Sequence, residues 1–378
     1  MKSKNFFILC SLGASLINFR SDLIKDLVNN GYKVYCAAPK SSNEVKNKIE
    51  NLGANFVNLD IDFHSLNPIN FIYDYKRLLK KVKLINPDFF LAYTSKPVIL
   101  LGLVSFSFKN SKFFPMITGL GYYFNNYKKK YLIKYILILL YKISCRKAKM
   151  FIFQNHDDHN EFKKLNIISK KSKTLVVNGS GVNLSKYKKY KKKISKKIIF
   201  VMTSRLLYQK GVKEFCLAAK IVKKKFPDVL FVHAGGFDNS PDRIKKSDFN
   251  KWQSYGHVKF LGQIKMSDVK QLLKKSDIFV LPSYYREGIP RSSMEALASC
   301  CAILTCNIPG CNKTVVNNYN GYSLPINNPI KLAEKMIYLI SNPKILKKFQ
   351  EMSYELSKNF DVKKINNSII KKINNFNL

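Results

Sequence analysis

The sequence has few acidic residues and no long apolar run. Only 24 of its 378 residues are Asp or Glu, against 66 Lys or Arg, which gives a formal net charge of +42. No stretch reaches the roughly 18 apolar residues that a membrane-spanning helix needs, since the best candidate, Leu132 to Cys145, contains Lys134 and Lys142. The apolar run after Met1 is too short for the core of a signal peptide. We therefore expect a cytoplasmic protein without a spanning segment.

A metal site is also poorly supported. The eight cysteines form no C-x-x-C pair of the kind that structural zinc uses, and we expect buried, reduced thiols. The nearest metal-like cluster runs from His156 to His159, where a His-x-x-His spacing could place two imidazoles on one helix face. The same segment fits a helix start that is capped by Asn155 and has acids in its first turn. We expect no metal and no cofactor.

The positive charge would attract nucleic acid, anionic lipid or phosphorylated substrates. The sequence lacks an RNP-like aromatic motif, a zinc finger and a basic recognition helix, so a nucleic-acid binder is the weaker alternative and we expect no nucleic-acid partner. From Phe89 to His156, 11 Lys or Arg and no acid are interleaved with 16 Phe or Tyr. This region fits either a solvated lysine face over an aromatic core or a surface that rests on anionic lipid headgroups.

Short apolar strands alternate with amphipathic helices, which is the pattern of parallel sheets with crossover helices. We predict a first α/β domain over residues 1–185, a linker over 186–197, a second α/β domain over 198–360 and a last segment over 361–378. Eight of the twelve linker residues are lysine. Two such sheets in tandem predict a cleft between them, with ligands at the carboxyl ends of the strands.

The strongest local signal runs from Tyr285 to Ala298, which follows a predicted strand and opens a helix with Pro290 in its first turn. Gly288 lets backbone come close to a ligand, and the free amides of the helix start form an anion site. Glu287 lies just before the helix and Glu295 about a turn and a half inside it. Both carboxylates could therefore face one ligand that lies across the helix start, and carboxylates there would suit sugar hydroxyls, which need acceptors.

Two further segments follow predicted strands. In Ser204 to Gly211, Arg205 and Lys210 could hold a diphosphate, which two fixed cations stabilise most when it departs as a leaving group; the alternative is ordinary surface charge. Ser11 to Ser15 follows the first strand and is predicted to be a short loop before a helix. It lacks a G-x-G-x-x-G fingerprint, but the loop could supply backbone amides from the first domain.

These motifs carry a family resemblance. Glu287 and Glu295 form an E-x7-E pattern. The chain resembles the retaining family 4 glycosyltransferases of the two-domain GT-B fold through that pattern and through four more segments: Ser204-Arg205, Lys210-Gly211, Phe260-Leu261-Gly262 and Pro309-Gly310-Cys311.

The first half is similar to the branch of that family that builds bacterial O-antigen, capsule and protein-glycan precursors on undecaprenyl diphosphate. The segments concerned are Tyr93 to Pro97, Thr118 to Gly121 and Gln154 to Asp158. Leu66-Asn67-Pro68 and Gly211 to Phe215 are similar to the N-acetylgalactosaminyltransferases that extend a diacetylbacillosamine-lipid.

The resemblance implies two Rossmann-like domains that face each other across a cleft, with the last helix, Val362 to Phe376, packed back on the first domain. It implies a hexosyltransferase that moves a hexose or N-acetylhexosamine, with N-acetylgalactosamine a candidate, from a UDP-sugar to an undecaprenyl-diphosphate-linked saccharide with retained configuration. Such an enzyme would be peripheral on the inner face of the cell membrane and would contact its anionic surface. The same donor chemistry on a soluble acceptor is the alternative.

The resemblance also assigns roles to residues. Glu287 would contact the donor sugar hydroxyls, Glu295 the ribose, and Arg205 with Lys210 the diphosphate. The remaining donor-binding positions would be Gly13 in the first domain and Gly262, Gly288, Ile289 and Pro290 in the second. No metal is implied. Thr94 to Lys96 stand where many relatives place a His, so no catalytic residue is assigned in the first domain.

Overall fold

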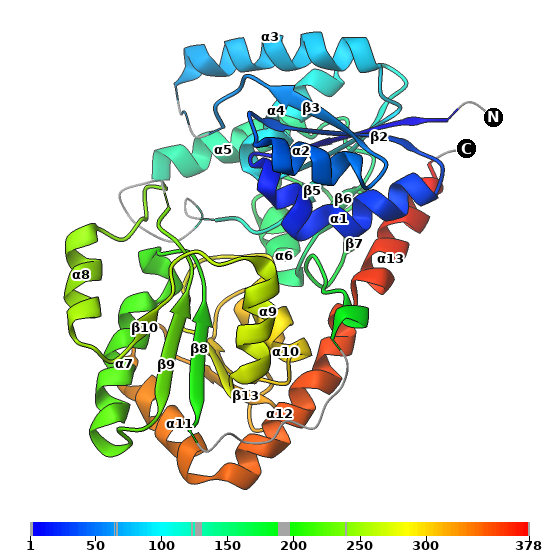
Figure 1. Cartoon of the computed structure of the whole chain (residues 1–378). Coiled ribbons are helices and arrows are strands. Elements are labelled where there is room, and N and C mark those ends of the chain that lie inside the picture. The colour runs from blue at the N-terminus through cyan, green and yellow to red at the C-terminus, as the bar shows by residue number, and fades with distance from the viewer. Residues whose placement is uncertain are drawn as a thin grey trace. The chain divides into compact units, whose positions relative to one another are not determined.

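The chain divides into two compact units. The computed structural model describes residues 3–63, 65, 67–121, 124, 131–187, 197–238 and 240–376. The first unit comprises Met1–Gly181 together with Val362–Leu378, and the second comprises Val182–Asp361. Figure 1 shows the red last helix beside the blue first helix, within the first unit. Most of the expected linker, residues 188–196, lies outside the described residues.

The first unit is built on a parallel seven-stranded sheet of order β3-β2-β1-β4-β5-β6-β7. Its strands are β1 (Asn5–Leu9), β2 (Lys33–Pro39), β3 (Asn55–Leu59), β4 (Phe89–Tyr93), β5 (Lys112–Ile117), β6 (Phe151–Phe153) and β7 (Thr174–Val176). The chain runs outward from β1 in one direction and from β4 in the other. These two neighbouring strands therefore form the point at which the winding of the sheet reverses, where open α/β sheets bind ligands as a rule.

Helices cover both faces of this sheet. They are α1 (Gly13–Asn29), α2 (Asn43–Glu50), α3 (Pro68–Ile85), α4 (Ser95–Ser105), α5 (Tyr131–Ser144), α6 (His156–Lys164) and α13 (Val362–Asn374). Alternate residues of β1 serve the two sides, because successive side chains of a strand point to opposite faces. Phe6 and Ile8 pack with α1, α2 and α13, whereas Phe7 and Leu9 belong to the core under α3, α4, α5 and α6.

The last helix is tied to the first unit by polar and aromatic contacts. The Tyr32 hydroxyl donates to Asn374 Oδ1 at 2.6 Å, and Asn366 Nδ2 donates to Asp26 Oδ2 at 2.8 Å. The Phe376 ring lies edge-on to Phe114, with centroids 5.6 Å apart. The final segment is therefore part of the first unit's core.

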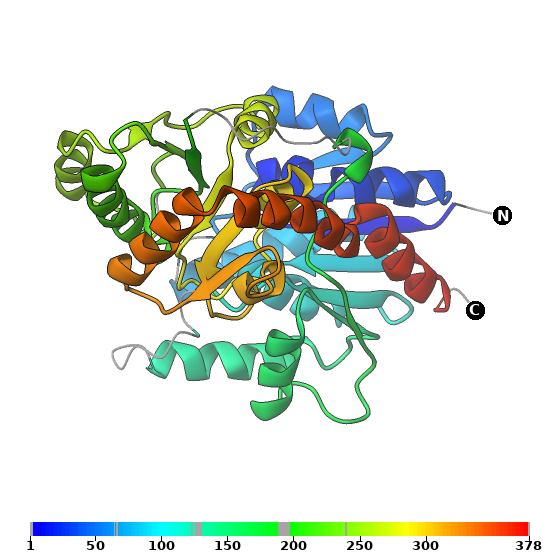
Figure 2. The ribbon, with the colours of Figure 1, turned by 90° about the horizontal axis from the view of Figure 1, so that it is seen from below.

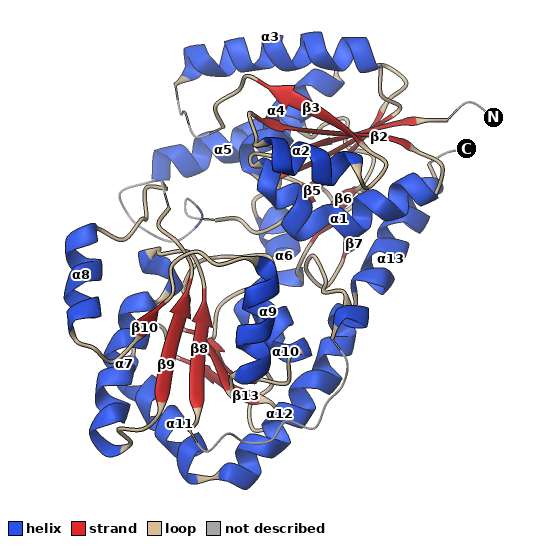
Figure 3. Ribbon diagram, viewed as in Figure 1, coloured by secondary structure: helices blue, strands red, loops and turns tan. Residues whose placement is uncertain are grey.

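The second unit repeats the plan with a parallel six-stranded sheet of order β10-β9-β8-β11-β12-β13, drawn in red in Figure 3. Its strands are β8 (Ile199–Thr203), β9 (Leu230–Ala234), β10 (Lys259–Phe260), β11 (Ile278–Leu281), β12 (Ala302–Cys306) and β13 (Gly321–Leu324). The α-helices are α7 (Val212–Lys225), α8 (Lys246–Ser254), α9 (Met266–Lys275), α10 (Arg291–Ala298), α11 (Pro329–Ser341) and α12 (Pro343–Ser357). Here the direction of winding reverses between β8 and β11, which are hydrogen-bonded neighbours.

Short 3-10 helices complete the second unit: η3 (Leu184–Lys186), η4 (Tyr208–Lys210), η5 (Cys311–Thr314) and η6 (Lys358–Phe360). All eight cysteines are buried and none forms a disulfide, as expected from their apolar surroundings. None of the described helices has the length and apolar character needed to cross a bilayer.

Two local expectations were wrong. The segment Ser11 to Ser15 was expected to be a loop, but α1 already begins at Gly13. Pro290 was expected inside the first turn of its helix, whereas it is the N-cap residue before α10 begins at Arg291. Both errors concern helix starts that no side chain caps with a hydrogen bond, so the usual Ser, Thr, Asp or Asn signal is missing.

Candidate active site

The site in the second unit centres on an ion pair between two strand-end loops. Lys210, the last residue of η4, follows β8, and Glu287 lies in the loop after β11. Lys210 Nζ contacts Glu287 Oε1 directly, and their side chains are only 10% and 18% exposed. The ammonium group also lies over the Tyr285 ring, 5.3 Å from its centroid. The fold thus holds a shielded cation and a carboxylate at the point where the sheet reverses direction.

Hydrogen bonds to one backbone carbonyl join these two loops. The Tyr284 amide and the Ser283 hydroxyl both donate to the Gln209 carbonyl oxygen, at 2.8 and 3.0 Å. Gly211 adopts a φ of +80°, and a Cβ there would lie 2.3 Å from the Pro282 carbonyl oxygen. Only glycine allows this approach, so the Lys-Gly sequence after β8 has a structural reason.

Arg205, the other predicted cation, has a different acidic partner. Its Nη1 donates to Asp238 Oδ2 at 2.6 Å, and Asp238 Oδ1 accepts from the Ser240 amide, also at 2.6 Å. Burial acts to raise the pKa of Asp238, but Arg205 and the Ser240 amide together hold it below its usual value. The Arg205 side chain is 57% exposed. The guanidinium is therefore oriented by Asp238 yet accessible to a ligand.

Asp238 was not identified from the sequence. It lies in the loop after β9, the strand next to β8, and so belongs to the same edge of the sheet. The available signal was its rarity, because an acid at a strand end stands out in a chain with only 24 acidic residues.

The Asp238 pair makes a testable contribution to stability. Because Arg205 is exposed, we expect Asp238→Asn to lower the free energy of unfolding at neutral pH by less than about 1 kcal/mol. A carboxyl whose folded-state pKa is depressed stabilises the fold above its unfolded pKa of about 3.9 and loses that effect as pH falls through the folded value. The melting temperatures of the two proteins should therefore converge on acidification below about pH 4. A difference that grows in acid would contradict the pairing.

The second predicted carboxylate, Glu295, also has a basic partner. Arg291 Nε donates to Glu295 Oε1 at 2.9 Å across one turn of α10. Burial raises the pKa of Glu295, and Arg291 opposes that shift. Gly288, Ile289 and Pro290, which lead into α10, are buried as well. The E-x7-E pattern thus presents two carboxylates, each paired with a cation.

Gly310 packs closely against the backbone of the loop that carries Glu287. It has a φ of +84°, and a Cβ there would lie 2.3 Å from the Gly288 carbonyl oxygen and 2.6 Å from that of Glu287. A side chain at this position would force the backbone to shift, because the atoms it would meet belong to the backbone and not to the end of a flexible side chain. The Pro309-Gly310-Cys311 segment therefore shapes the loop that carries Glu287.

Gly310→Ala should consequently displace the Glu287 loop. We expect a loss of about 1–3 kcal/mol in unfolding free energy, from the clash and the left-handed backbone together, and a matching loss of activity. Gly256→Ala is the control, since Gly256 has a similar φ of +66° but no neighbouring atom within 4 Å of its added Cβ. Equal effects of the two variants in denaturant unfolding and turnover assays would contradict a specific role for the close approach.

The two remaining predicted glycines are Gly262 and Gly13. Gly262 is exposed, with a φ of +64°, and its carbonyl oxygen accepts from the Gly235 amide at 2.8 Å. Gly13 belongs to the first unit, at the start of α1. A Cβ at Gly13 would lie 2.1 Å from Ser41 Oγ, so this helix start is closely packed against the loop after β2.

The first unit has a polar cluster at its own point of reversal. Thr94 Oγ1 donates to Ser11 Oγ at 3.1 Å, and the Ser15 and Tyr93 hydroxyls lie 2.8 Å apart. Thr94 has a φ of +68° and a ψ of 152°, a conformation that is strained for a β-branched residue and costs about 1–3 kcal/mol. The strain is located directly after β4.

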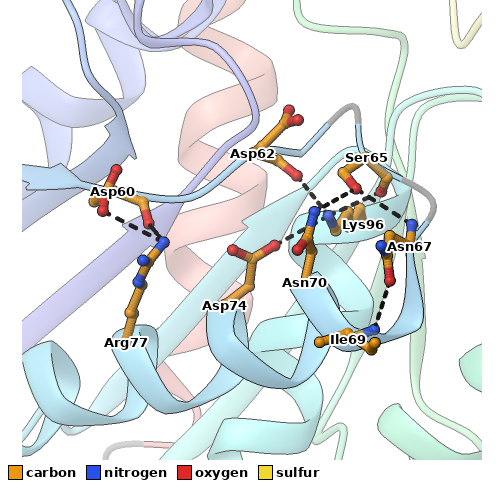
Figure 4. Close-up of polar contacts among 9 residues, drawn as sticks. All are labelled: Asp60, Asp62, Ser65, Asn67, Ile69, Asn70, Asp74, Arg77 and Lys96. Atoms are coloured by element: carbon orange, nitrogen blue, oxygen red, sulfur yellow. Dashed lines mark hydrogen bonds and ion pairs between the residues drawn. The ribbon is translucent and has the colours of Figure 1, made fainter.

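Lys96 has a structural role beside this cluster. Its ammonium donates to the carbonyl oxygens of Asp62 and Ser65, at 2.6 and 3.1 Å, and pairs with buried Asp74 of α3 at 3.1 Å (Figure 4). It therefore joins α4 to the chain entering α3, where Asn67 caps the helix. Leu66, from one of the segments that carry the resemblance, lies outside the described residues.

The His-x-x-His segment forms a capped helix start. Asn155 Oδ1 accepts from the Asp158 amide at 2.7 Å, as expected, and α6 begins at His156. His159 Nε2 lies 3.3 Å from Thr174 Oγ1 and its ring packs edge-on to Phe153. Among the residues that the structure describes, no three His, Cys, Asp or Glu side chains gather in a way that could hold a metal.

Comparisons with known proteins place this fold in an enzyme family. Residues 184–356 match the family model described as "Glycosyl transferases group 1", and residues 9–155 match "Glycosyl transferase 4-like". A curated relative from Campylobacter jejuni, N,N'-diacetylbacillosaminyl-diphospho-undecaprenol alpha-1,3-N-acetylgalactosaminyltransferase, is 33% identical over 350 residues, which is 89% of each chain. The chain belongs to the family 4 glycosyltransferases and is an enzyme of that class.

Two further proteins are similar to this chain, one in sequence and one in fold. The Escherichia coli UDP-Gal:alpha-D-GlcNAc-diphosphoundecaprenol alpha-1,3-galactosyltransferase is 32% identical over 132 residues, about a third of each chain. Anabaena Alr3699/HepE, solved in complex with UDP, superposes with a TM-score of 0.78 at 16% identity and covers 98% of this chain and 100% of its own. This likeness confirms the predicted GT-B fold with two Rossmann-like domains.

Proposed function

We propose that this enzyme transfers an N-acetylhexosamine or hexose from a UDP-sugar to an undecaprenyl-diphosphate-linked saccharide, with retention of anomeric configuration. The observation that carries the proposal is the shielded Lys210–Glu287 pair at the β8/β11 strand ends. A fixed cation suits a phosphate group and a fixed carboxylate suits sugar hydroxyls. The names of the Campylobacter and E. coli relatives, both of which specify a diphospho-undecaprenol substrate, support the acceptor.

In the proposed donor site, two cations bind the diphosphate. Lys210 and Arg205 neutralise the diphosphate, and they do so most when the sugar bond breaks and charge builds up on the departing UDP. Glu287 accepts hydrogen bonds from the sugar, and Glu295 from the ribose. The UDP complex of the Anabaena protein supports UDP as the nucleotide, and the Campylobacter relative makes N-acetylgalactosamine the first sugar to test.

The chemical step in this proposal needs no protein nucleophile. The acceptor hydroxyl attacks the face of the sugar that UDP leaves, so configuration is retained, and the departing phosphate takes the acceptor proton. The protein's contribution is orientation and charge. Because Arg205 and Lys210 supply positive charge themselves, we propose that turnover needs no divalent metal.

The proposed acceptor determines where in the cell the enzyme works. A polyprenyl-diphosphate saccharide stays in the membrane, so the enzyme must work at the bilayer surface. We therefore propose peripheral association with the inner face of the cell membrane.

Nucleotide binding tests the donor assignment. A ligand that binds only the folded state raises stability by RT ln(1 + [L]/Kd), so UDP should raise the melting temperature more than GDP or ADP. The shift should persist in EDTA. A larger shift with GDP or ADP, or one that vanishes in EDTA and returns with Mg²⁺, would contradict the proposed donor site.

A further inference from the structure

One helix of the first unit displays a continuous apolar stripe to solvent. Five large side chains on one face of α5 are between 41% and 74% exposed. Four of them are spaced at three and four residues and the fifth lies beside that line, so together they cover one face of the helix over about 16 Å. They are Leu132, Tyr135, Ile136, Leu139 and Ile143. We call this set the α5 stripe.

The opposite side of α5 is firmly packed. Ile138 and Tyr141 are buried, and the Tyr141 ring lies edge-on to Phe162 of α6 at 5.3 Å. Lys134 Nζ of α5 lies 4.0 Å from Glu161 Oε1 of α6. Figure 2 shows α5 along one edge of its unit, beside α6. The stripe therefore faces outward because the helix is anchored on its other side.

The exposed charges at one end of the stripe are positive. Lys142, Arg146, Lys147 and Lys149 are exposed at the C-terminal end of α5 and just beyond it. The sequence from Phe89 to His156 contains no acid at all. An apolar stripe with basic residues at its end matches an anionic bilayer, where the stripe enters the boundary between headgroups and acyl chains and the cations meet lipid phosphates.

A second copy of the chain is a poor occupant for the same surface. Pairing two stripes would bring two acid-free, basic regions together, in a protein whose formal net charge is +42. Like charges at an interface oppose association. The charge pattern therefore favours lipid over self-association.

We propose that the α5 stripe inserts into the surface of an anionic membrane and is the element that holds the enzyme there. This inference rests on the proposed function, since a membrane-bound acceptor gives the enzyme a reason to stay at the bilayer. It adds the surface and the lipid chemistry that the acceptor alone does not specify.

Vesicle flotation of the whole chain tests the proposal. The wild type should bind vesicles of phosphatidylcholine mixed with phosphatidylglycerol more tightly than phosphatidylcholine alone. The triple variant Leu132→Gln, Ile136→Gln and Leu139→Gln, which keeps the net charge, should bind the anionic vesicles about a hundredfold more weakly. The matched control, Leu230→Gln, Ile326→Gln and Ile330→Gln, removes three exposed apolar residues from the second unit and should bind like the wild type.

A fluorescent probe reports insertion directly. The chain has a single tryptophan, Trp252, which is buried in the second unit. In Tyr135→Trp, brominated phospholipid should quench the added emission, while Trp252 in the wild type stays unquenched. Emission of Tyr135→Trp that is unaffected by bound brominated vesicles would overturn insertion of the stripe.

Further outcomes would also overturn the proposal. They are equal vesicle binding by the wild type and the α5 triple variant, or a wild-type dimer that the variant converts to monomer without any lipid effect. UDP stabilisation separates this inference from the proposed function. The triple variant should keep the wild-type shift with UDP, whereas failure of the donor assignment would remove that shift from the wild type as well.

Discussion

Glu287→Ala is expected to lower kcat/KM at least about a hundredfold. The change removes the carboxylate that we assign to the donor sugar and also leaves Lys210 without its contact in a shielded site. An unpaired, largely buried group costs about 1–3 kcal/mol of unfolding free energy, so the variant should remain folded at room temperature. Turnover with a UDP-sugar and circular dichroism of the same preparation measure the two effects.

A matched control separates the site from ion pairs in general. Lys331 and Glu334 form an exposed pair on α11, 2.8 Å apart, and such pairs contribute little. Glu334→Ala should therefore keep wild-type activity and stability. Wild-type turnover in Glu287→Ala, or an equal loss in Glu334→Ala, would remove the basis for the proposed donor site.

Arg205→Ala is expected to weaken UDP binding by about ten- to a hundredfold, since hydrogen bonds to charged groups contribute about 1.5–3 kcal/mol. Stability without ligand should change little, because the guanidinium is more than half exposed. Calorimetric titration with UDP, together with the melting temperature of the free protein, measures both quantities.

Arg77→Ala is the control for this variant. Arg77 of the first unit is 55% exposed and lies 3.3 Å from Asp60 (Figure 4). It therefore resembles Arg205 in its exposure and in having an Asp partner. Its replacement should leave UDP affinity unchanged. Unaltered affinity in Arg205→Ala would show that the exposed cation does not reach the nucleotide.

The order of the elements was enough to predict that the candidate site residues share one edge of a sheet. Arg205, Lys210, Glu287 and Glu295 all follow predicted strands, and parallel strands place such residues at one edge of a sheet. The fold class could be predicted for the same reason, because alternating strands and helices leave few topologies. The Lys210–Glu287 contact could not be predicted, since it depends on how two loops 77 residues apart pack together.

Other features left weaker signals. The helix α4 was not predicted, because eight of its eleven residues are buried and a helix apolar on all sides lacks the amphipathic period. The exposure of the α5 stripe was hidden for the same reason, since apolar residues occupy both faces of that helix. Arg205 and Lys210 have separate acidic partners because of how the loops after β8, β9 and β11 pack, and the sequence alone does not specify that packing.

The most direct test of the proposed function is transfer to a lipid-linked acceptor. Purified enzyme would receive UDP-sugars, UDP-N-acetylgalactosamine first, and undecaprenyl-diphosphate-linked saccharides in detergent or vesicles with EDTA present. We expect release of UDP together with a lengthened lipid-linked saccharide, whose new anomeric linkage, determined by NMR, has the configuration of the donor. A product of inverted configuration, or transfer from GDP- or ADP-sugars in preference to UDP-sugars, would contradict the proposed function.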